Sequence, residues 1–192
     1  MNEEGWAVWF VGLPGCGKTT LAKGVHDYLY VKGMDVVALQ MDARRKTYFP
    51  DPQYTAQERA KAYGLFVDEA VELVRQGKGV LMDGAACDVS MRTNARERIS
   101  RFAEVCVHCE IEVAIERESN RPNGAVMAGL YEKALKRQQT GEQFEGLGEV
   151  LGIDVEFGID PDAELILDNT HLSKEETLRK VLHFLDSWLG SV

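Results

Sequence analysis

The residues Gly12-Leu13-Pro14-Gly15-Cys16-Gly17-Lys18-Thr19 fit the pattern G-x-x-x-x-G-K-[ST]. An apolar segment, Trp6 to Val11, precedes them and is short enough for a buried strand. Apolar residues at helical spacing follow them. A strand, a glycine-rich loop and a helix in this order form a cradle for phosphate groups, because the loop turns its backbone N–H groups inward and the helix adds its positive end. The sequence therefore predicts that this chain binds a nucleoside triphosphate.

The polar residues of this loop have expected roles in binding ATP and Mg²⁺. Lys18 should reach the β- and γ-phosphates, and the hydroxyl of Thr19 should ligate the magnesium ion. We expect the nucleotide to be bound by Gly12, Leu13, Pro14, Gly15, Cys16, Gly17, Lys18, Thr19, Thr20 and Arg117.

Composition limits the classes of partner. At 192 residues the chain suits one domain spanning 1–192, and 45% hydrophobic residues can supply its core. The formal net charge of −9 argues against nonspecific binding to nucleic acid or to an anionic membrane. No apolar run approaches the roughly 20 residues that a membrane span needs. A small anionic substrate must then be attracted by a local basic cluster.

The four cysteines and the first residues both predict a cytoplasmic protein. Cys16, Cys87, Cys106 and Cys109 are not spaced like a disulfide framework. The start, Met-Asn-Glu-Glu, has no basic region, so we expect no export signal. The C-x-x-C formed by Cys106 and Cys109 lacks a second pair of ligands, and its residues are expected to alternate between the inside and the outside of a strand. Both features favour packing over metal binding.

Hydrophobic patterning predicts an α/β fold, with a parallel sheet and helices on both faces as in three-layer P-loop NTPases. The predicted strands are 6–11, 35–41, 79–83, 105–109 and 164–167. The predicted helices are 18–31, 55–75, 111–118, an arginine-rich helix after residue 83, and a final helix from residue 172. Prolines keep 49–52 in a loop. The polar region 120–152, helical around 130–138, is expected to form a mobile lid.

Two carboxylates follow predicted strands at the sheet edge where ligands bind in such folds. Asp42 could take the proton from an acceptor hydroxyl, and Asp83 ends an apolar strand in the Walker-B pattern and could hold Mg²⁺. Together with Lys18 they are the expected catalytic residues. The division of roles between the two carboxylates stays open from the sequence.

Arginines near these carboxylates are candidates for binding an anionic acceptor. Arg44, Arg45 and Arg59 could clamp a phosphate or sulfate group, because guanidinium matches such oxygens bidentately. Arg117 and Arg121 could neutralise charge in the transition state.

Further motifs in order along the chain resemble those of adenylylsulfate kinases. The motifs are Asp42-Ala-Arg-Arg45, Gly129-Leu-Tyr-Glu-Lys-Ala134, Phe144-Glu-Gly146 and Ala163-Glu-Leu-Ile-Leu-Asp168. That family transfers the γ-phosphate of MgATP to the 3′-hydroxyl of adenosine 5′-phosphosulfate. The resemblance implies that Phe144 packs on the adenine of the acceptor. It also implies that Asp42, Arg45, Arg59 and Lys133 contact this acceptor.

The chain departs from the family pattern on the acceptor side. The D-R-x-x-N-x-R stretch reads Glu58-Arg59-Ala-Lys-Ala62-Tyr-Gly64, and the I-S-P segment reads Ala85-Ala86-Cys87. Another nucleotide derivative, such as cytidine diphosphoramidate, is therefore an alternative acceptor. A sensor that binds ATP without turnover is the alternative from another class. We also allow for a homodimer.

Overall fold

The structure is a computed structural model that describes residues 5–120 and 129–190. Its helices and strands follow one another in the order β1 Trp6–Val11, α1 Lys18–Val31, β2 Val36–Gln40, α2 Met41–Tyr48, α3 Ala56–Arg75, β3 Gly79–Asp83, α4 Val89–Arg98, β4 Phe102–His108, α5 Ile111–Ser119, α6 Leu130–Thr140, β5 Leu165–Asp168 and α7 Lys174–Leu189.

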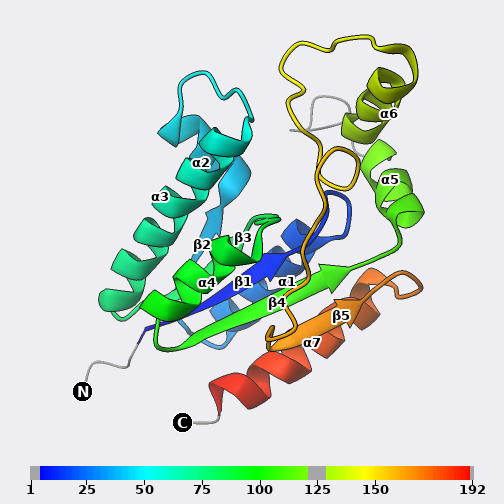
Figure 1. The fold of residues 1–192 in the computed structure, drawn as a ribbon. Coiled ribbons are helices and arrows are strands. Elements are labelled where there is room, and N and C mark those ends of the chain that lie inside the picture. The colour runs from blue at the N-terminus through cyan, green and yellow to red at the C-terminus, as the bar shows by residue number, and fades with distance from the viewer. Residues whose placement is uncertain (1–4, 121–128, 191–192) are drawn as a thin grey trace.

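The strands form a parallel sheet in the order β2-β3-β1-β4-β5, with helices on both faces (Figure 1). One core cluster packs α1 and α7 against the sheet, and a second packs α3 and α4 against the opposite face. The predicted three-layer α/β fold is therefore confirmed. Because all strands run in the same direction, their carboxyl ends meet at one edge of the sheet.

β4 corrects one prediction from the sequence. It begins at Phe102, three residues before the predicted start, and every residue from Phe102 to Val107 is buried. The expected alternation between a buried and an exposed face is wrong, because β4 lies between β1 and β5 and both of its faces are covered.

An ion pair lies deep inside, between α4 and β4. Nε of Arg92 is 3.2 Å from Oε2 of Glu104, and both side chains are fully buried. Arg92 also donates to the carbonyls of Ala86, at 2.8 Å, and Gly158, at 2.6 Å. Burial raises the pKa of Glu104 to about 7, although the charge of Arg92 opposes that shift.

The segment after β2 is helical, which the sequence did not predict. The strand ends at Gln40, one residue earlier than expected, and α2 begins at Met41. This short helix buries Met41 and Arg45. It stops at Phe49, whose backbone is extended, because Pro50 disfavours the helical conformation in the residue before it.

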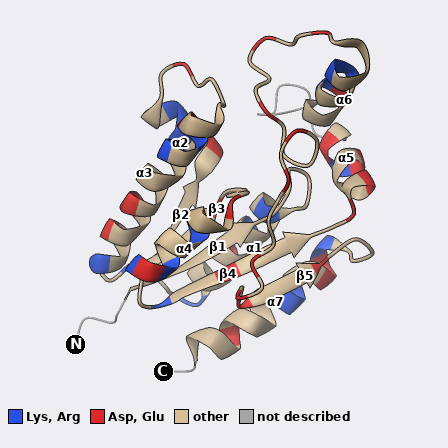
Figure 2. Cartoon of the chain, viewed as in Figure 1, with Lys and Arg blue, Asp and Glu red and all other residues tan. Residues whose placement is uncertain are grey.

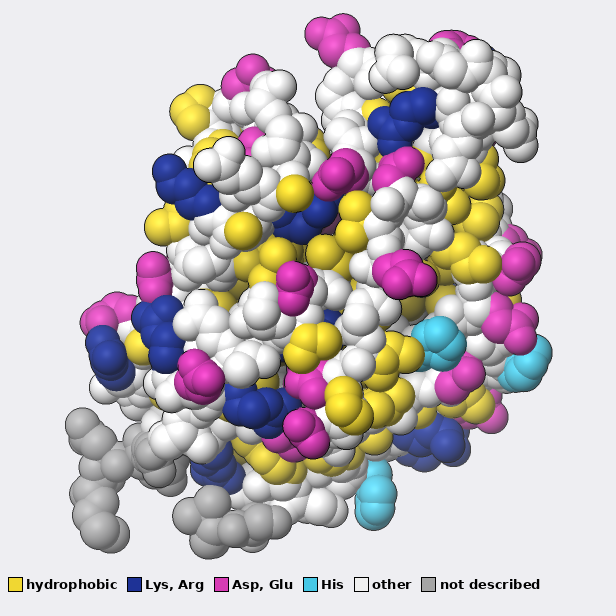
Figure 3. Space-filling model, viewed as in Figure 1, with side chains coloured by type: hydrophobic (Ala, Val, Ile, Leu, Met, Phe, Trp, Pro, Cys, Tyr) yellow, Lys and Arg dark blue, Asp and Glu magenta, His cyan; other side chains and the backbone are white. Residues whose placement is uncertain are grey.

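Two parts of the chain rise above the carboxyl edge of the sheet, and a notch separates them at the top of the molecule (Figures 1 and 3). One holds α2 and the start of α3, and the other holds α5, α6 and the loop that follows. The predicted lid falls partly on 121–128, outside the described residues, whereas its predicted helical middle is confirmed as α6. Within the described residues, no helix is long and apolar enough to cross a membrane.

Candidate functional site

The glycine-rich loop after β1 is packed so closely that larger residues would not fit. A Cβ at Gly12 would lie 2.2 Å from the carbonyl oxygen of Val107, and one at Gly15 would lie 2.2 Å from that of Ala114. The φ angles of Gly12, Gly15 and Gly17 are 139°, 85° and 102°, which side chains disfavour. The loop therefore keeps the tight turn at the start of α1 that a phosphate cradle requires.

Lys18 lies inside this loop. Its side chain is 9% exposed, and Nζ donates to the carbonyl of Leu13 at 2.8 Å and lies 3.8 Å from Sγ of Cys16. Thr19 and Thr20 are exposed in the first turn of α1. Lys18 and Thr19 therefore lie at the start of α1, and their roles in binding phosphate and Mg²⁺ stay predictions.

Asn169, just after β5, braces the loop, and sequence reasoning missed it. Its Nδ2 donates to the carbonyl of Cys16 at 2.9 Å. Arg117 in turn donates to both Oδ1 and the backbone oxygen of Asn169, each at 2.9 Å. The guanidinium expected to meet the nucleotide is thus engaged in holding the loop. The position of Asn169 at the end of a predicted strand was the available signal.

A second contact joins the loop to α6. The hydroxyl of Tyr131 donates to the carbonyl of Pro14 at 2.9 Å, and the Tyr131 side chain is fully buried. The helix of the predicted lid is therefore anchored on the glycine-rich loop.

The two predicted carboxylates lie at the same edge of the sheet in different settings. Asp83 is buried at the end of β3, and its register places it beside Phe10 of β1 and Gln40 of β2. Asp42 is exposed in the first turn of α2, two residues beyond Gln40. Buried Asp83 suits an ion held near the loop, and exposed Asp42 suits contact with an arriving substrate.

The described residues contain no group of three or more His, Cys, Asp or Glu side chains placed to hold a metal ion. Mg²⁺ binds through one or two carboxylates, water and substrate phosphates. Thr19 and Asp83 provide a hydroxyl and a carboxylate of the required kind.

Each of the three candidate arginines has an acidic partner within the chain. Arg44 pairs with Glu69 at 2.7 Å, and Arg45 pairs with Glu58 at 2.9 Å. Nη1 of Arg59 lies 3.2 Å from Oε2 of Glu149, and its Nη2 donates to the backbone oxygen of Glu149 at 3.4 Å. The sequence did not reveal these partners, because the two residues of each pair are separated along the chain. Glu149, for example, is far from Arg59 in the sequence.

Glu58 is held firmly in its place. It accepts hydrogen bonds from the backbone nitrogens of Gln53, at 2.6 Å, and Tyr54, at 3.3 Å, besides its pair with Arg45. Burial acts to raise the pKa of Glu58, but these hydrogen bonds outweigh it and keep the pKa below its usual value. Glu58 therefore remains ionised, and the charge of Arg45 is compensated.

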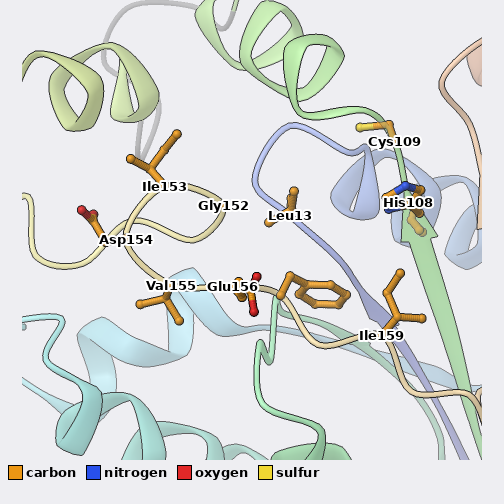
Figure 4. A pocket seen from close by; sticks show the side chains of 11 residues that line it. Leu13, His108, Cys109, Gly152, Ile153, Asp154, Val155, Glu156 and Ile159 are labelled. Atoms are coloured by element: carbon orange, nitrogen blue, oxygen red, sulfur yellow. The ribbon is translucent and has the colours of Figure 1, made fainter. Parts of the chain in front are cut away.

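A cavity of about 240 Å³ opens beside the glycine-rich loop (Figure 4). Leu13 contributes from the loop, His108 and Cys109 come from the end of β4, and a strap of chain over residues 152–159 closes the other side. Most of its lining side chains are apolar, and Phe157 is its aromatic residue. A flat ring next to the phosphate cradle would fit such a space.

The remaining predicted acceptor residues lie in the part of the chain around α6. Lys133 is exposed on α6, and Phe144 is half-buried in the loop after it. Nζ of Lys136 lies 5.7 Å from the centre of the Phe144 ring. Phe144 is not among the residues that line the cavity of Figure 4.

The C-x-x-C thiols are packing residues. Cys106 and Cys109 are buried and free, and burial raises their pKa values to about 12 and about 11. Cys106 packs in the core cluster on one face of the sheet and Cys109 in the cluster on the other, so packing accounts for both thiols.

Comparisons with known proteins agree with this geometry. The sequence model of the adenylylsulphate kinase family matches residues 4–168. An adenylyl-sulfate kinase of Halothermothrix orenii is 31% identical over 185 residues, which cover 96% of this chain and 91% of that protein. A cytidine diphosphoramidate kinase of Campylobacter jejuni is 26% identical over 176 residues, covering 88% of this chain and 89% of that protein.

Among solved structures, the Mycobacterium tuberculosis APS kinase CysC, in complex with AMPPNP and APS, superposes with a TM-score of 0.78 at 25% identity. The match covers 96% of this chain and 99% of that one. The chain therefore belongs to the adenylylsulphate kinase family and is an ATP-dependent phosphotransferase.

Proposed function

We propose that this kinase transfers the γ-phosphate of ATP to the 3′-hydroxyl of adenosine 5′-phosphosulfate. The observation that carries the proposal is the match of the adenylylsulphate kinase family model to residues 4–168, and the cavity beside Leu13 offers space next to the phosphate loop. The family match and the CysC structure, solved with both an ATP analogue and APS, support the same acceptor.

The proposed roles of the residues follow from their places. Lys18 binds the β- and γ-phosphates, while Thr19 and Asp83 would hold Mg²⁺, which neutralises phosphate charge when it is bound. Asp42, exposed in the first turn of α2, orients the acceptor hydroxyl and takes its proton as the bond to phosphorus forms. Thr20 and the backbone of the loop line the triphosphate.

On the acceptor side, Arg45, Arg59 and Lys133 provide positive charge, and Phe144 is the proposed stacking residue. Arg117 contributes to nucleotide binding through Asn169, by keeping the loop in shape. We further propose that 1–192 acts as one catalytic unit in the cytoplasm, and that a homodimer is its assembly.

A second acceptor is favoured by one observation. Ala62 and Gly64 stand where the family pattern has asparagine and arginine, and an added Cβ at Gly64 would meet nothing within 4 Å. The relative that phosphorylates cytidine diphosphoramidate shares a comparable level of identity. A cytidine diphosphate derivative is therefore the competing acceptor.

The test is an acceptor panel read out as ADP release. Purified protein with MgATP is offered adenylylsulfate, cytidine diphosphate derivatives and simple nucleoside monophosphates. We expect adenylylsulfate to give a kcat/KM within the range of about 10⁴–10⁸ M⁻¹s⁻¹ that good enzymes reach. A cytidine derivative preferred by more than tenfold would replace the proposed acceptor. ADP release that no acceptor stimulates would support the sensor instead.

A further inference from the structure

Glu149 places a carboxylate against an arginine expected to bind the acceptor. Its side chain is 47% exposed, whereas that of Arg59 is only 10% exposed. The arginine is therefore buried and held in place, while the carboxylate has room to turn toward solvent. A carboxylate in this position occupies the guanidinium much as the phosphate or sulfate of an acceptor would.

The loop that carries Glu149 is held in position by its neighbours. Gly148 has a φ of +52°, and a Cβ there would lie 2.6 Å from the Cβ of Tyr54, so the loop touches the α2–α3 connection directly. Arg137 of α6 donates to the carbonyl of Gly148 at 2.8 Å and pairs with Asp154 at 2.5 Å. The position of Glu149 thus follows from the fold of the loop.

The charge pattern agrees with this placement. Figure 2 shows basic residues on α2 and acidic residues along the segment that descends from α6. A hollow of about 430 Å³ lies between these parts, lined by Tyr54, Arg137, Glu149 and Asp154 among others.

Arg45 and Arg59 differ in how firmly the carboxylate of the acidic partner is held in place. Glu58 is 11% exposed and also accepts two backbone hydrogen bonds, so it stays with Arg45. Among the hydrogen bonds of the described residues, the carboxylate of Glu149 accepts only from Arg59. Arg59 also donates to the backbone oxygen of Glu149. Arg59 is the arginine whose positive charge can be released to a ligand.

We propose that Glu149 is a specificity-determining residue of the acceptor site, whose carboxylate occupies Arg59 until an anionic group of the acceptor displaces it. The inference rests on the proposed function, in which Arg59 binds the acceptor. The anionic group of a strongly charged acceptor binds the guanidinium of Arg59, and the carboxylate of Glu149 turns into water. An acceptor without one leaves the ion pair intact and gains nothing from Arg59.

The test compares Glu149→Gln with the wild type in binding and in turnover. Calorimetry without ATP gives the Kd for adenylylsulfate, and ADP release gives kcat and KM. Removal of the competing charge is expected to lower Kd and KM by about two- to tenfold, the scale of a partly exposed ion pair, and to leave kcat nearly unchanged. Adding Arg59→Ala to Glu149→Gln should abolish this gain in affinity for adenylylsulfate.

Glu142→Gln is the matched control. Glu142 is in the same segment, is 46% exposed and pairs with Lys136 at 2.8 Å, so its loss removes an equivalent ion pair away from Arg59. Its Kd should equal that of the wild type. Equal Kd values for Glu149→Gln and Glu142→Gln would overturn the role of Glu149.

The binding and turnover results separate this inference from the proposed reaction. Turnover of adenylylsulfate with an unchanged Kd in Glu149→Gln would reject the role of Glu149 alone. Tighter binding without turnover would keep that role and reject the reaction. Failure of adenylylsulfate to bind any of these proteins would reject both.

Discussion

Lys18 donates a hydrogen bond from Nζ to the carbonyl of Leu13, so its ammonium group lies within the glycine-rich loop. Lys18→Ala should abolish acceptor-dependent ADP release and leave the fold intact, because the lysine acts on phosphate charge. Circular dichroism and thermal unfolding check the fold, and ADP release checks the activity. Near-normal turnover by a folded variant would contradict the assignment.

Asp42 and Asp83 can be separated by their kinetics. Asp42→Asn should lower kcat by about 10²-fold or more, the scale for losing a positioned base, with little change in the KM for ATP. Asp83→Asn should instead raise the concentration of Mg²⁺ needed for half-maximal activity. Titration of both variants with Mg²⁺ at saturating ATP makes the comparison. The reverse pattern would exchange the two roles.

At this scale, the sequence indicates the candidate residues that belong to a motif and misses those that contact a partner from another element. Lys18 and Asp83 follow from local patterns. Asn169, Glu58 and Glu149 do not, because each acts on a residue that the fold brings near from another element. Tertiary contacts of this kind leave no spacing signal in a single sequence.

At the scale of elements, the brace from α5 through Asn169 to the loop before α1 can be tested. Asn169→Ala removes the side-chain hydrogen-bond partner of the Cys16 carbonyl and of the Arg117 guanidinium. Loss of the partner of a buried polar group costs about 1–3 kcal/mol of stability. We expect the KM for ATP to rise about tenfold or more, with a smaller change in the KM for the acceptor.

Asp168→Asn is the control for this experiment. Asp168 is adjacent, exposed at the end of β5, and accepts a hydrogen bond from the backbone of Thr170 that asparagine can also accept. Its KM for ATP should match that of the wild type. An Asn169→Ala variant with unchanged ATP kinetics would show that Arg117 holds the loop without it.

Elements with strong apolar patterns were predicted well, and an element without one was missed. β1, α1 and β3 have the predicted bounds because apolar runs and the glycine motif mark both their ends. α2 was missed because its eight residues are mostly polar and charged, so that no apolar stripe reveals it. Its helical form depends on packing of Met41 and Arg45 against the rest of the molecule.

For the whole molecule, the buried pair of Arg92 and Glu104 makes stability depend on pH. The pKa of Glu104 rises from 4.5 to about 7 in the folded protein, so between these values the folded state holds more protons than the unfolded state. The free energy of unfolding should therefore fall as pH rises through this window. The contribution of Glu104 between pH 5 and pH 8 should be about 1–3 kcal/mol.

Urea unfolding of the wild type and of Glu104→Gln at both pH values measures this contribution. Glu104→Gln also changes the partner of Arg92, so the quantity to compare is the change in the free energy of unfolding between the two pH values. That change should be smaller in the variant by the stated amount. An identical pH dependence in both proteins would show that Glu104 is not protonated in this range.

The overall architecture was predictable because alternating strands and helices with a glycine loop admit few topologies. The shape of the acceptor side was not, because it depends on where the segment after α6 returns over the sheet. That return creates both the cavity at Leu13 and the contact with Arg59.

The hydrogen bond from Tyr131 to Pro14 has a consequence for how the two ligands affect each other. It joins the loop expected to hold the triphosphate to α6, and Arg137 of the same helix holds the carbonyl next to Glu149. A nucleotide that displaced the backbone of Pro14 would act through α6 on the loop that carries Glu149. Such a linkage is reciprocal: the factor by which ATP changes the affinity for the acceptor is the factor by which the acceptor changes the affinity for ATP.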